Sequence, residues 1–192
     1  MKRILLLSFF SILFLASCSR TVTRIDPSTE IDLSGRWNDT DSRKVADQMI
    51  HDLFTSDAFK KYSESLGHKP VIIVGMIKNK TSEHIDAGNY VKKFEMVILN
   101  SGIAELVESD EFRDKLRQER ASQQDFADPA TVAAWGKEQG ADVMLFGEMN
   151  SETDTYNKKR VVNYQTTLFL TDIETNKRIW LGQNEIKKFV KN

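Results

Sequence analysis

Apolar residues recur at helical spacing in two long stretches of the chain. The first stretch follows Thr40 or Asp41, either of which can cap a helix, and continues to Gly67. The second begins near Asn89 and stops near Gly102, a residue type that is favoured where helices end. Each pattern predicts one amphipathic helix whose apolar side packs on a core.

Two more helices are expected further along the chain. The segment 111–120 is densely charged with a narrow apolar seam, which is typical of a surface helix. Asp128 and Pro129 supply an N-cap and a proline at the first helical position, and Val132 and Trp135 mark the inward side of the helix that follows. The charge run over 111–120 is more often a solvated helix face than a binding site.

Strands are predicted from runs of β-branched residues and from alternation. The continuous apolar runs 71–77 and 143–146 indicate buried strands, and 103–107 indicates a short one. Alternation over 162–170 indicates a half-buried strand, and 178–186 returns beside it after a turn. This order of elements predicts an α/β fold, a mixed β-sheet with helices packed mainly on one face.

The chain divides into three parts on this interpretation. Residues 1–17 are a signal peptide, residues 18–39 a flexible tether, and residues 40–192 one globular domain. Within that domain, residues 150–159 are rich in Asn, Asp, Thr and Lys and are expected to form a polar loop.

The first residues have the pattern of an export signal. Lys2 and Arg3 precede an apolar run over 4–15, which is too short for a span of about 20 residues and ends in small residues. Leu15-Ala16-Ser17-Cys18 resembles the lipobox of bacterial lipoproteins, which implies a diacylglyceryl group on the thiol of Cys18, cleavage before Cys18 and acylation of the new amino terminus. Ser19 at the next position resembles the arrangement that sorts lipoproteins to the outer membrane.

Composition narrows the class of function. The chain has 27 basic and 28 acidic residues and a formal net charge of -1, which argues against a general nucleic-acid binder. Cys18 is the single cysteine, so an acylated chain has no internal disulfide and depends on burial and hydrogen bonds for its stability.

The sequence does not match the motifs of nucleotide-binding, metal-binding or hydrolytic proteins. A phosphate-binding loop at Lys80-Thr81 lacks glycine at positions 74 and 79, and the three histidines lack metal-ligand spacing. No serine lies in a Gly-x-Ser-x-Gly elbow. The acidic residues between 105 and 111 suit a solvated helix start better than a glycosidase pair. We therefore expect no catalytic residue, metal or cofactor.

Several motifs together resemble the LpoB family of lipoprotein activators of class A penicillin-binding proteins. Besides the lipobox at Cys18, they are Gly35-Arg36-Trp37-Asn38-Asp39-Thr40-Asp41-Ser42-Arg43, the strand 71–74 running into Asn79-Lys80-Thr81, Gly140-Ala141-Asp142-Val143, and the hairpin 171–180. The segment from Gly35 to Arg43 is the most specific of these motifs, because a tryptophan in a polar tether suggests that Trp37 docks on the domain.

The resemblance implies a fold similar to the amino-terminal domain of TolB and a function exerted by contact. The partner would be a class A penicillin-binding protein, a bifunctional peptidoglycan synthase, and the chain would be an outer-membrane lipoprotein facing the periplasm. The tether is short for a family whose enterobacterial members carry a long flexible one. Met149, Arg160 and Tyr164 are candidate exposed anchors for the partner. The ordinary alternatives are that Tyr164 faces the core and that Arg160 is only solvated.

Three alternatives stay open. One is a lipoprotein component of an envelope secretion or assembly system with a curli-export-like domain, although long lipid-facing hairpins are not evident. Another is an envelope glycan hydrolase that uses Glu105 and Glu108, and the third is an inert scaffold.

Overall fold

The computed structural model describes residues 20–131, 133 and 138–191. The described residues contain four helices and five strands. The helices are α2 (Asp39–Thr55), α3 (Asp57–Leu66), α4 (Ala87–Ser101) and α5 (Asp110–Phe126). The strands are β1 (Val71–Asn79), β2 (Glu105–Leu106), β3 (Val143–Tyr156), β4 (Lys159–Asp172) and β5 (Arg178–Lys191).

The single helix expected up to Gly67 is wrong, because α2 and α3 are separate. Ser56 has extended backbone angles (φ -65°, ψ 141°), and its hydroxyl accepts from the amide of Phe59 to cap α3. The cap of α2 is also earlier than expected. Asn38 and Asp41 each accept the other's backbone N–H, a capping box that begins the helix at Asp39.

The other helix predictions have different outcomes. The helix that ends at Gly102 is confirmed as α4, with Gly102 in the left-handed conformation of a C-cap. The surface helix is confirmed as α5, which is longer than expected and has no buried residue. Of the helix predicted after Asp128, Val132 and Trp135 lie outside the described residues.

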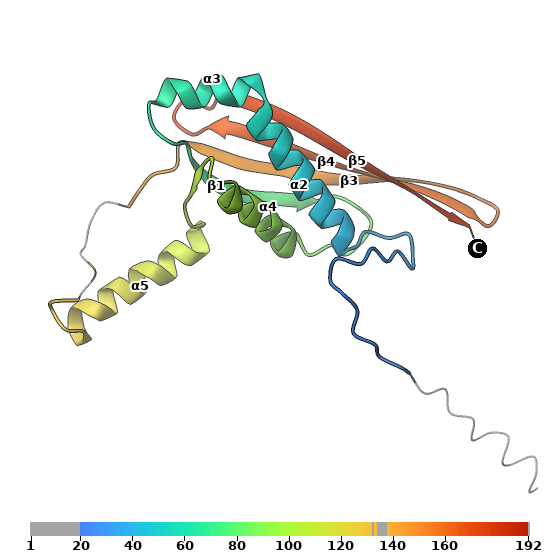
Figure 1. The fold of residues 1–192 in the computed structure, drawn as a ribbon, viewed down its shortest axis with the longest axis horizontal. Coiled ribbons are helices and arrows are strands. Elements are labelled where there is room, and N and C mark those ends of the chain that lie inside the picture. The colour runs from blue at the N-terminus through green and yellow to red at the C-terminus, as the bar shows by residue number, and fades with distance from the viewer. Residues whose placement is uncertain (1–19, 132, 134–137, 192) are drawn as a thin grey trace, which may run out of the picture. The chain divides into compact units, whose positions relative to one another are not determined.

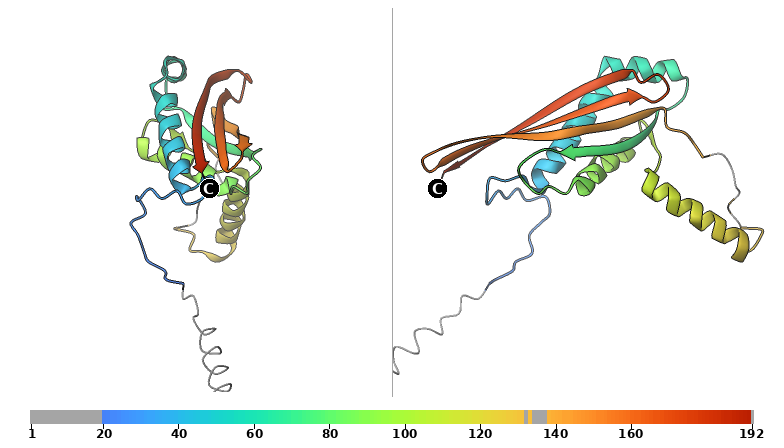
Figure 2. Two further views of the ribbon diagram at one scale, coloured as in Figure 1. Left: turned by 90° about the vertical axis from the view of Figure 1, so that its right-hand side faces the viewer. Right: turned by 180° about the vertical axis from the view of Figure 1, so that it is seen from behind.

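The strands form one mixed sheet, as the sequence predicts, and their order in it is β2-β1-β3-β4-β5. β1 is parallel to β2 and β3, whereas β3, β4 and β5 are antiparallel neighbours. Helices α2 and α4 lie side by side on one face of this sheet (Figure 1). Seen from behind, the strands lie in front of both helices (Figure 2). The α/β fold with helices mainly on one face is confirmed.

The polar loop expected over 150–159 is wrong, because β3 continues to Tyr156. Tyr156 pairs with Lys159 across a two-residue turn in which Asn157 has a positive φ of 51°. The polar side chains do not prevent strand formation, since the antiparallel ladder satisfies their backbone groups. The hairpin runs on past helices α2 and α4 (Figure 1).

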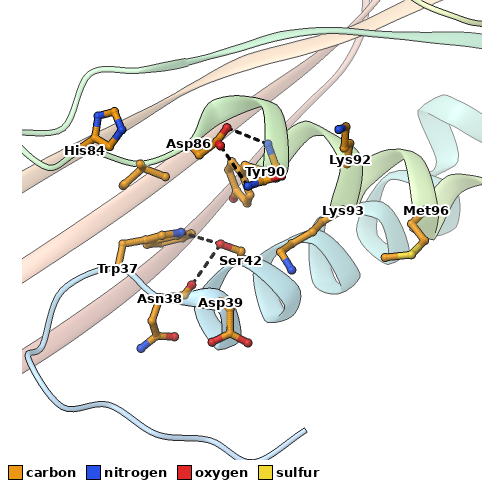
Figure 3. A pocket seen from close by; sticks show the side chains of 12 residues that line it. Trp37, Asn38, Asp39, Ser42, His84, Asp86, Tyr90, Lys92, Lys93 and Met96 are labelled. Atoms are coloured by element: carbon orange, nitrogen blue, oxygen red, sulfur yellow. Dashed lines mark hydrogen bonds between the residues drawn. The ribbon is translucent and has the colours of Figure 1, made fainter. Parts of the chain in front are cut away.

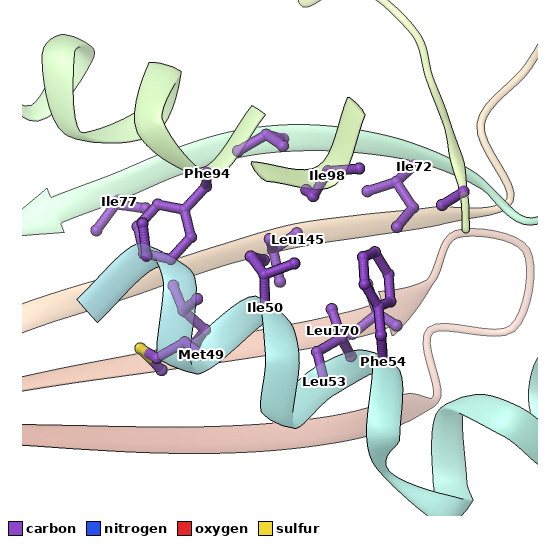
Figure 4. Packing of buried hydrophobic residues seen from close by; sticks show 14 of the residues in the cluster. Met49, Ile50, Leu53, Phe54, Ile72, Ile77, Phe94, Ile98, Leu145 and Leu170 are labelled. Atoms are coloured by element: carbon purple, nitrogen blue, oxygen red, sulfur yellow. The ribbon is translucent and has the colours of Figure 1, made fainter. Parts of the chain in front are cut away.

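The core lies between α2, α4 and the sheet (Figure 4). Leu53, Ile72, Phe94, Leu145 and Leu170 are completely buried there. Burying each such side chain stabilises the fold by about 1.5–3 kcal/mol relative to exposure. The core therefore fixes α2 and α4 on the sheet and positions the loops between them.

The compact unit that contains this core begins at Ile31, whereas the sequence placed the domain start at Thr40. Residues 31–38, the N-terminal strap, precede α2 and contact β4 and β5. No helix within the described ranges is long and apolar enough to cross a membrane.

Candidate functional site

Trp37 docks on the domain, as its place in the sequence predicts. Its indole Nε1 donates to Oγ of Ser42 at 2.7 Å. Its ring meets Tyr90 and Tyr164 edge-on, with centroid distances of 5.7 and 5.4 Å. Such aromatic pairs contribute beyond their buried area, so Trp37 holds the strap against both α4 and β4.

Glu83 joins the strap to the sheet through its two carboxylate oxygens. Oε2 accepts from the backbone N–H of Trp37 at 3.0 Å, and Oε1 accepts from the hydroxyl of Tyr164 at 2.6 Å. Burial and then the Glu83 hydrogen bond raise the pKa of Tyr164 above its ordinary value. Tyr164 therefore remains a protonated donor at physiological pH.

Lys188 on β5 is the second attachment point of the strap. Its Nζ lies 2.7 Å from Oδ2 of Asp32 and 2.5 Å from Oδ2 of Asp41, and it donates to the carbonyl of Arg36 at 2.8 Å. Burial alone would lower the pKa of Lys188, but the bonds to Asp32 and Asp41 outweigh it and raise the pKa. A charged lysine that is 9% exposed thus links the strap, α2 and β5.

Gly35 lets the strap approach β5 closely. Its φ is +65°, and a Cβ atom there would lie 2.1 Å from Cγ2 of Val190. Beside it, the guanidinium of Arg160 donates to the carbonyl of Ser34 at 3.2 Å. A larger residue at position 35 would have to push the strap away from the sheet.

An open groove of about 530 Å³ lies beside the docked strap (Figure 3). It is lined by Trp37, Asn38, Asp39, Ser42, His84, Ile85, Asp86, Asn89, Tyr90, Lys92, Lys93 and Met96. Tyr90 is 2% exposed and forms the inner wall, where its hydroxyl lies 3.1 Å from Oγ1 of Thr166. The rim carries lysines and aspartates, so the groove combines an aromatic wall with charges of both signs.

Three exposed apolar side chains lie on α4 and just after it, and the first of them lines this groove. Met96 belongs to the groove, and Leu99 and Ile103 follow it at intervals of three and four residues. Their exposed fractions are 57%, 57% and 45%. Exposed apolar groups rimmed by polar residues mark surfaces that bind other proteins. We call the groove and these three residues the α4 surface.

The expectation that Met149 and Tyr164 are exposed anchors is wrong, since both are 1% exposed. Met149 pairs with Thr166, and Ser151 pairs with Tyr164, so these positions of β3 and β4 share the sheet face that the helices cover. Arg160 is half-buried beside the strap. Cys18 lies outside the described residues.

One feature of the sequence indicates the α4 surface but played no part in predicting the helix from its apolar periodicity. Met96 and Leu99 fall away from the inward side defined by Phe94 and Ile98. Large apolar residues on the outer face of a helix are a mark of a binding surface only when they are neighbours in space. That Met96 and Trp37 line the same groove depends on how the strap folds back.

The described residues include the acidic side chains that were considered for metal and hydrolytic chemistry. No group of three or more His, Cys, Asp or Glu side chains in the described parts of the chain could hold a metal ion. Glu105 is exposed and accepts from Nε2 of Gln139 at 2.8 Å.

The family described as peptidoglycan-synthase activator LpoB matches residues 41–186. This chain belongs to that family. The match covers most of α2, all of β1 and α4, and most of the sheet. The description of the family supports, at the level of the family, a role in activating penicillin-binding proteins.

Solved structures of LpoB are among those to which the chain is similar. The C-terminal domain of LpoB from Escherichia coli is 15% identical, with a TM-score of 0.42 over 79% of this chain and 99% of that chain. The corresponding domain from Salmonella enterica is 16% identical, with a TM-score of 0.37 over 66% and 90%. Lipoprotein GNA1162 from Neisseria meningitidis is 13% identical, with a TM-score of 0.42 over 62% and 83%. No curated protein matches the chain.

Proposed function

We propose that this chain is an outer-membrane lipoprotein, anchored through acylated Cys18, whose periplasmic domain binds and activates a class A penicillin-binding protein. The observation that carries this proposal is the LpoB family match over residues 41–186. The lipobox at Cys18 and the serine that follows it support the anchor and its membrane.

Activation of this kind needs no catalytic group on the activator. A bound protein shifts an enzyme toward its active conformation by the difference between its affinities for the two conformations. Coupling of about 1–3 kcal/mol corresponds to an effect of roughly 5- to 150-fold. An activator therefore requires a surface that distinguishes conformations, which the α4 surface can supply.

The α4 surface is the best candidate contact for the synthase. Met96, Leu99 and Ile103 offer apolar area, and the neighbouring lysines and aspartates can fix the orientation of a partner. Trp37 and Tyr90 are held by hydrogen bonds and ring contacts, so the groove wall is formed before binding. Preformed surfaces lose less entropy on association.

The docked strap limits how far the domain can reach. Residues 18–30 remain as the tether, and fully extended they span at most about 45 Å. The proposal therefore requires the accessory domain of the synthase to come within the combined reach of this tether and the folded domain.

Glycan polymerisation by purified class A penicillin-binding proteins of the same organism tests the proposal. The activator is the chain from residue 18 carrying Cys18→Ser, which cannot be acylated. We expect one synthase to accelerate in a saturable way, and Met96→Glu to reduce that acceleration at least tenfold at subsaturating activator. Met76→Glu is the matched control, since Met76 is 74% exposed on β1.

One result would overturn this function, and another would overturn only its assignment to the α4 surface. If no synthase is accelerated or bound, the envelope assembly hypothesis takes its place. If Met76→Glu and Met96→Glu weaken the acceleration equally, activation survives but the α4 surface is not the contact.

A further inference from the structure

The end of the β3–β4 hairpin carries a concentration of cations that lack acidic partners. Two hollows of about 530 and 510 Å³ lie there. Their basic lining residues are Arg36, Lys158, Lys159, Arg160 and Lys191. Among the described residues, none of these five side chains forms an ion pair with a carboxylate.

Several basic residues elsewhere on the domain are paired with acids. Lys80 pairs with Glu148 in the middle of the sheet, and Arg117 lies 2.7 Å from Glu138. At the hairpin end, by contrast, Lys159 and Lys191 are directly opposite each other on β4 and β5. Like charges in such cross-strand positions are destabilising, so the local positive charge works against the fold.

Two aromatic side chains are exposed at the same end. Tyr156 is 76% exposed at the end of β3, and Phe189 is 62% exposed on β5. Neither ring has a role in the core. Aromatic rings beside lysines suit the boundary between water and lipid, where the ring enters the headgroup region and the cation meets phosphate.

The chain also enters the domain at this end. The carbonyl of Ser34 accepts from Arg160, and Gly35 packs against Val190 near the end of β5. The residues before Ile31 lead back to Cys18 within a tether of at most about 45 Å. An acyl group on Cys18 would therefore keep this basic end close to the membrane.

We propose that the hairpin end, residues 154–160 with Arg36 and 189–191, binds the surface of a membrane that contains anionic phospholipids. The phosphates meet the five cations on both sides of the turn, while Tyr156 and Phe189 enter the headgroup region. This contact goes beyond synthase activation, because it would orient the domain on its own membrane.

Co-sedimentation with lipid vesicles tests the proposal without any synthase. The protein is the chain from residue 18 with Cys18→Ser, so that no acyl group contributes to binding. Vesicles of phosphatidylglycerol and phosphatidylethanolamine are compared with vesicles in which phosphatidylcholine replaces phosphatidylglycerol. We expect binding to the anionic vesicles alone, and binding that weakens as salt is raised.

The double variant Lys159→Gln and Lys191→Gln should bind the anionic vesicles about 30-fold more weakly than the parent chain, given the usual attraction of each basic residue to such a surface. Lys60→Gln with Lys61→Gln is the matched control, because it removes the same charge from α3. That helix contacts the other end of β4, where Tyr62 donates to Asp172. Thermal unfolding of both variants verifies that they are folded.

Three results would overturn the proposal. The first is equal binding to neutral and anionic vesicles, and the second is equal weakening by the two double variants. The third is a hairpin variant that binds vesicles normally but no longer accelerates the synthase, which would make this end a contact for protein.

Discussion

Nζ of Lys188 on the last strand lies 2.5 Å from Oδ2 of Asp41 in the first turn of α2. The same carboxylate closes the capping box of α2 with Asn38, and the same ammonium holds Asp32 and the carbonyl of Arg36. One ion pair therefore joins the start of the domain to its end. Breaking this pair should therefore destabilise the start of α2, the N-terminal strap and β5 together.

Replacing Lys188 with methionine should lower the free energy of unfolding by about 3 kcal/mol. Asp41 is 7% exposed, and replacing Lys188 leaves its buried carboxylate with the capping hydrogen bond from Asn38 but without the Lys188 cation. Urea denaturation measures the loss. Lys187→Met is the control, because Lys187 is exposed on the same strand and should change stability by less than about 0.5 kcal/mol. Equal effects of the two substitutions would contradict the role of the buried pair.

Gly35→Ala should destabilise the domain more than Gly67→Ala. Both glycines have positive φ, so both substitutions carry a backbone cost of about 1 kcal/mol. Only at Gly35 does the new methyl group meet Val190, which adds roughly 1–3 kcal/mol. Adding Val190→Ala to Gly35→Ala should recover part of that difference. Denaturation curves in which the two single variants coincide would refute the close contact.

Tyr164→Phe should lower stability by about 2 kcal/mol at neutral pH, because the Glu83 carboxylate loses a donor. The effect should shrink at alkaline pH. The pKa of Tyr164 is raised in the folded state, so the stability it contributes is complete below the unfolded pKa of about 10 and is lost as pH rises further.

Unfolding measured from pH 7 to pH 11 checks this, with the variant as the reference. Tyr62, Tyr90 and Lys188 also have raised pKa values and will destabilise both proteins at high pH. The difference between the two curves isolates Tyr164. A constant difference across the range would show that its ionisation is not coupled to folding.

Lys191→Glu should increase stability by about 0.5 kcal/mol, since it converts a repulsive cross-strand pair with Lys159 into an attractive one. The gain should fall as salt is added. Lys187→Glu faces Asn163 across the strands and should show no comparable gain. Thermal unfolding at low and high salt distinguishes these outcomes, and a loss of stability in Lys191→Glu would contradict the register at the hairpin end.

The sequence by itself determined the elements whose signals are local. Gly102 ends α4, the apolar runs form β1 and the start of β3, and alternation identifies β4. These features depend on residues within a few positions of one another, so periodicity and capping residues were sufficient to predict them. The family resemblance was legible for the same reason, since it rests on short motifs.

The tertiary structure alone decided which of these residues meet. Tyr164 and Met149 were expected at the surface, but strand register turns them toward α2 and α4. Asp41 and Lys188 are nearly the length of the domain apart in sequence, and no local pattern marks them as partners. Burial and pairing between distant segments depend on strand register and on how the chain folds back on itself. Periodicity along the sequence does not encode either of these.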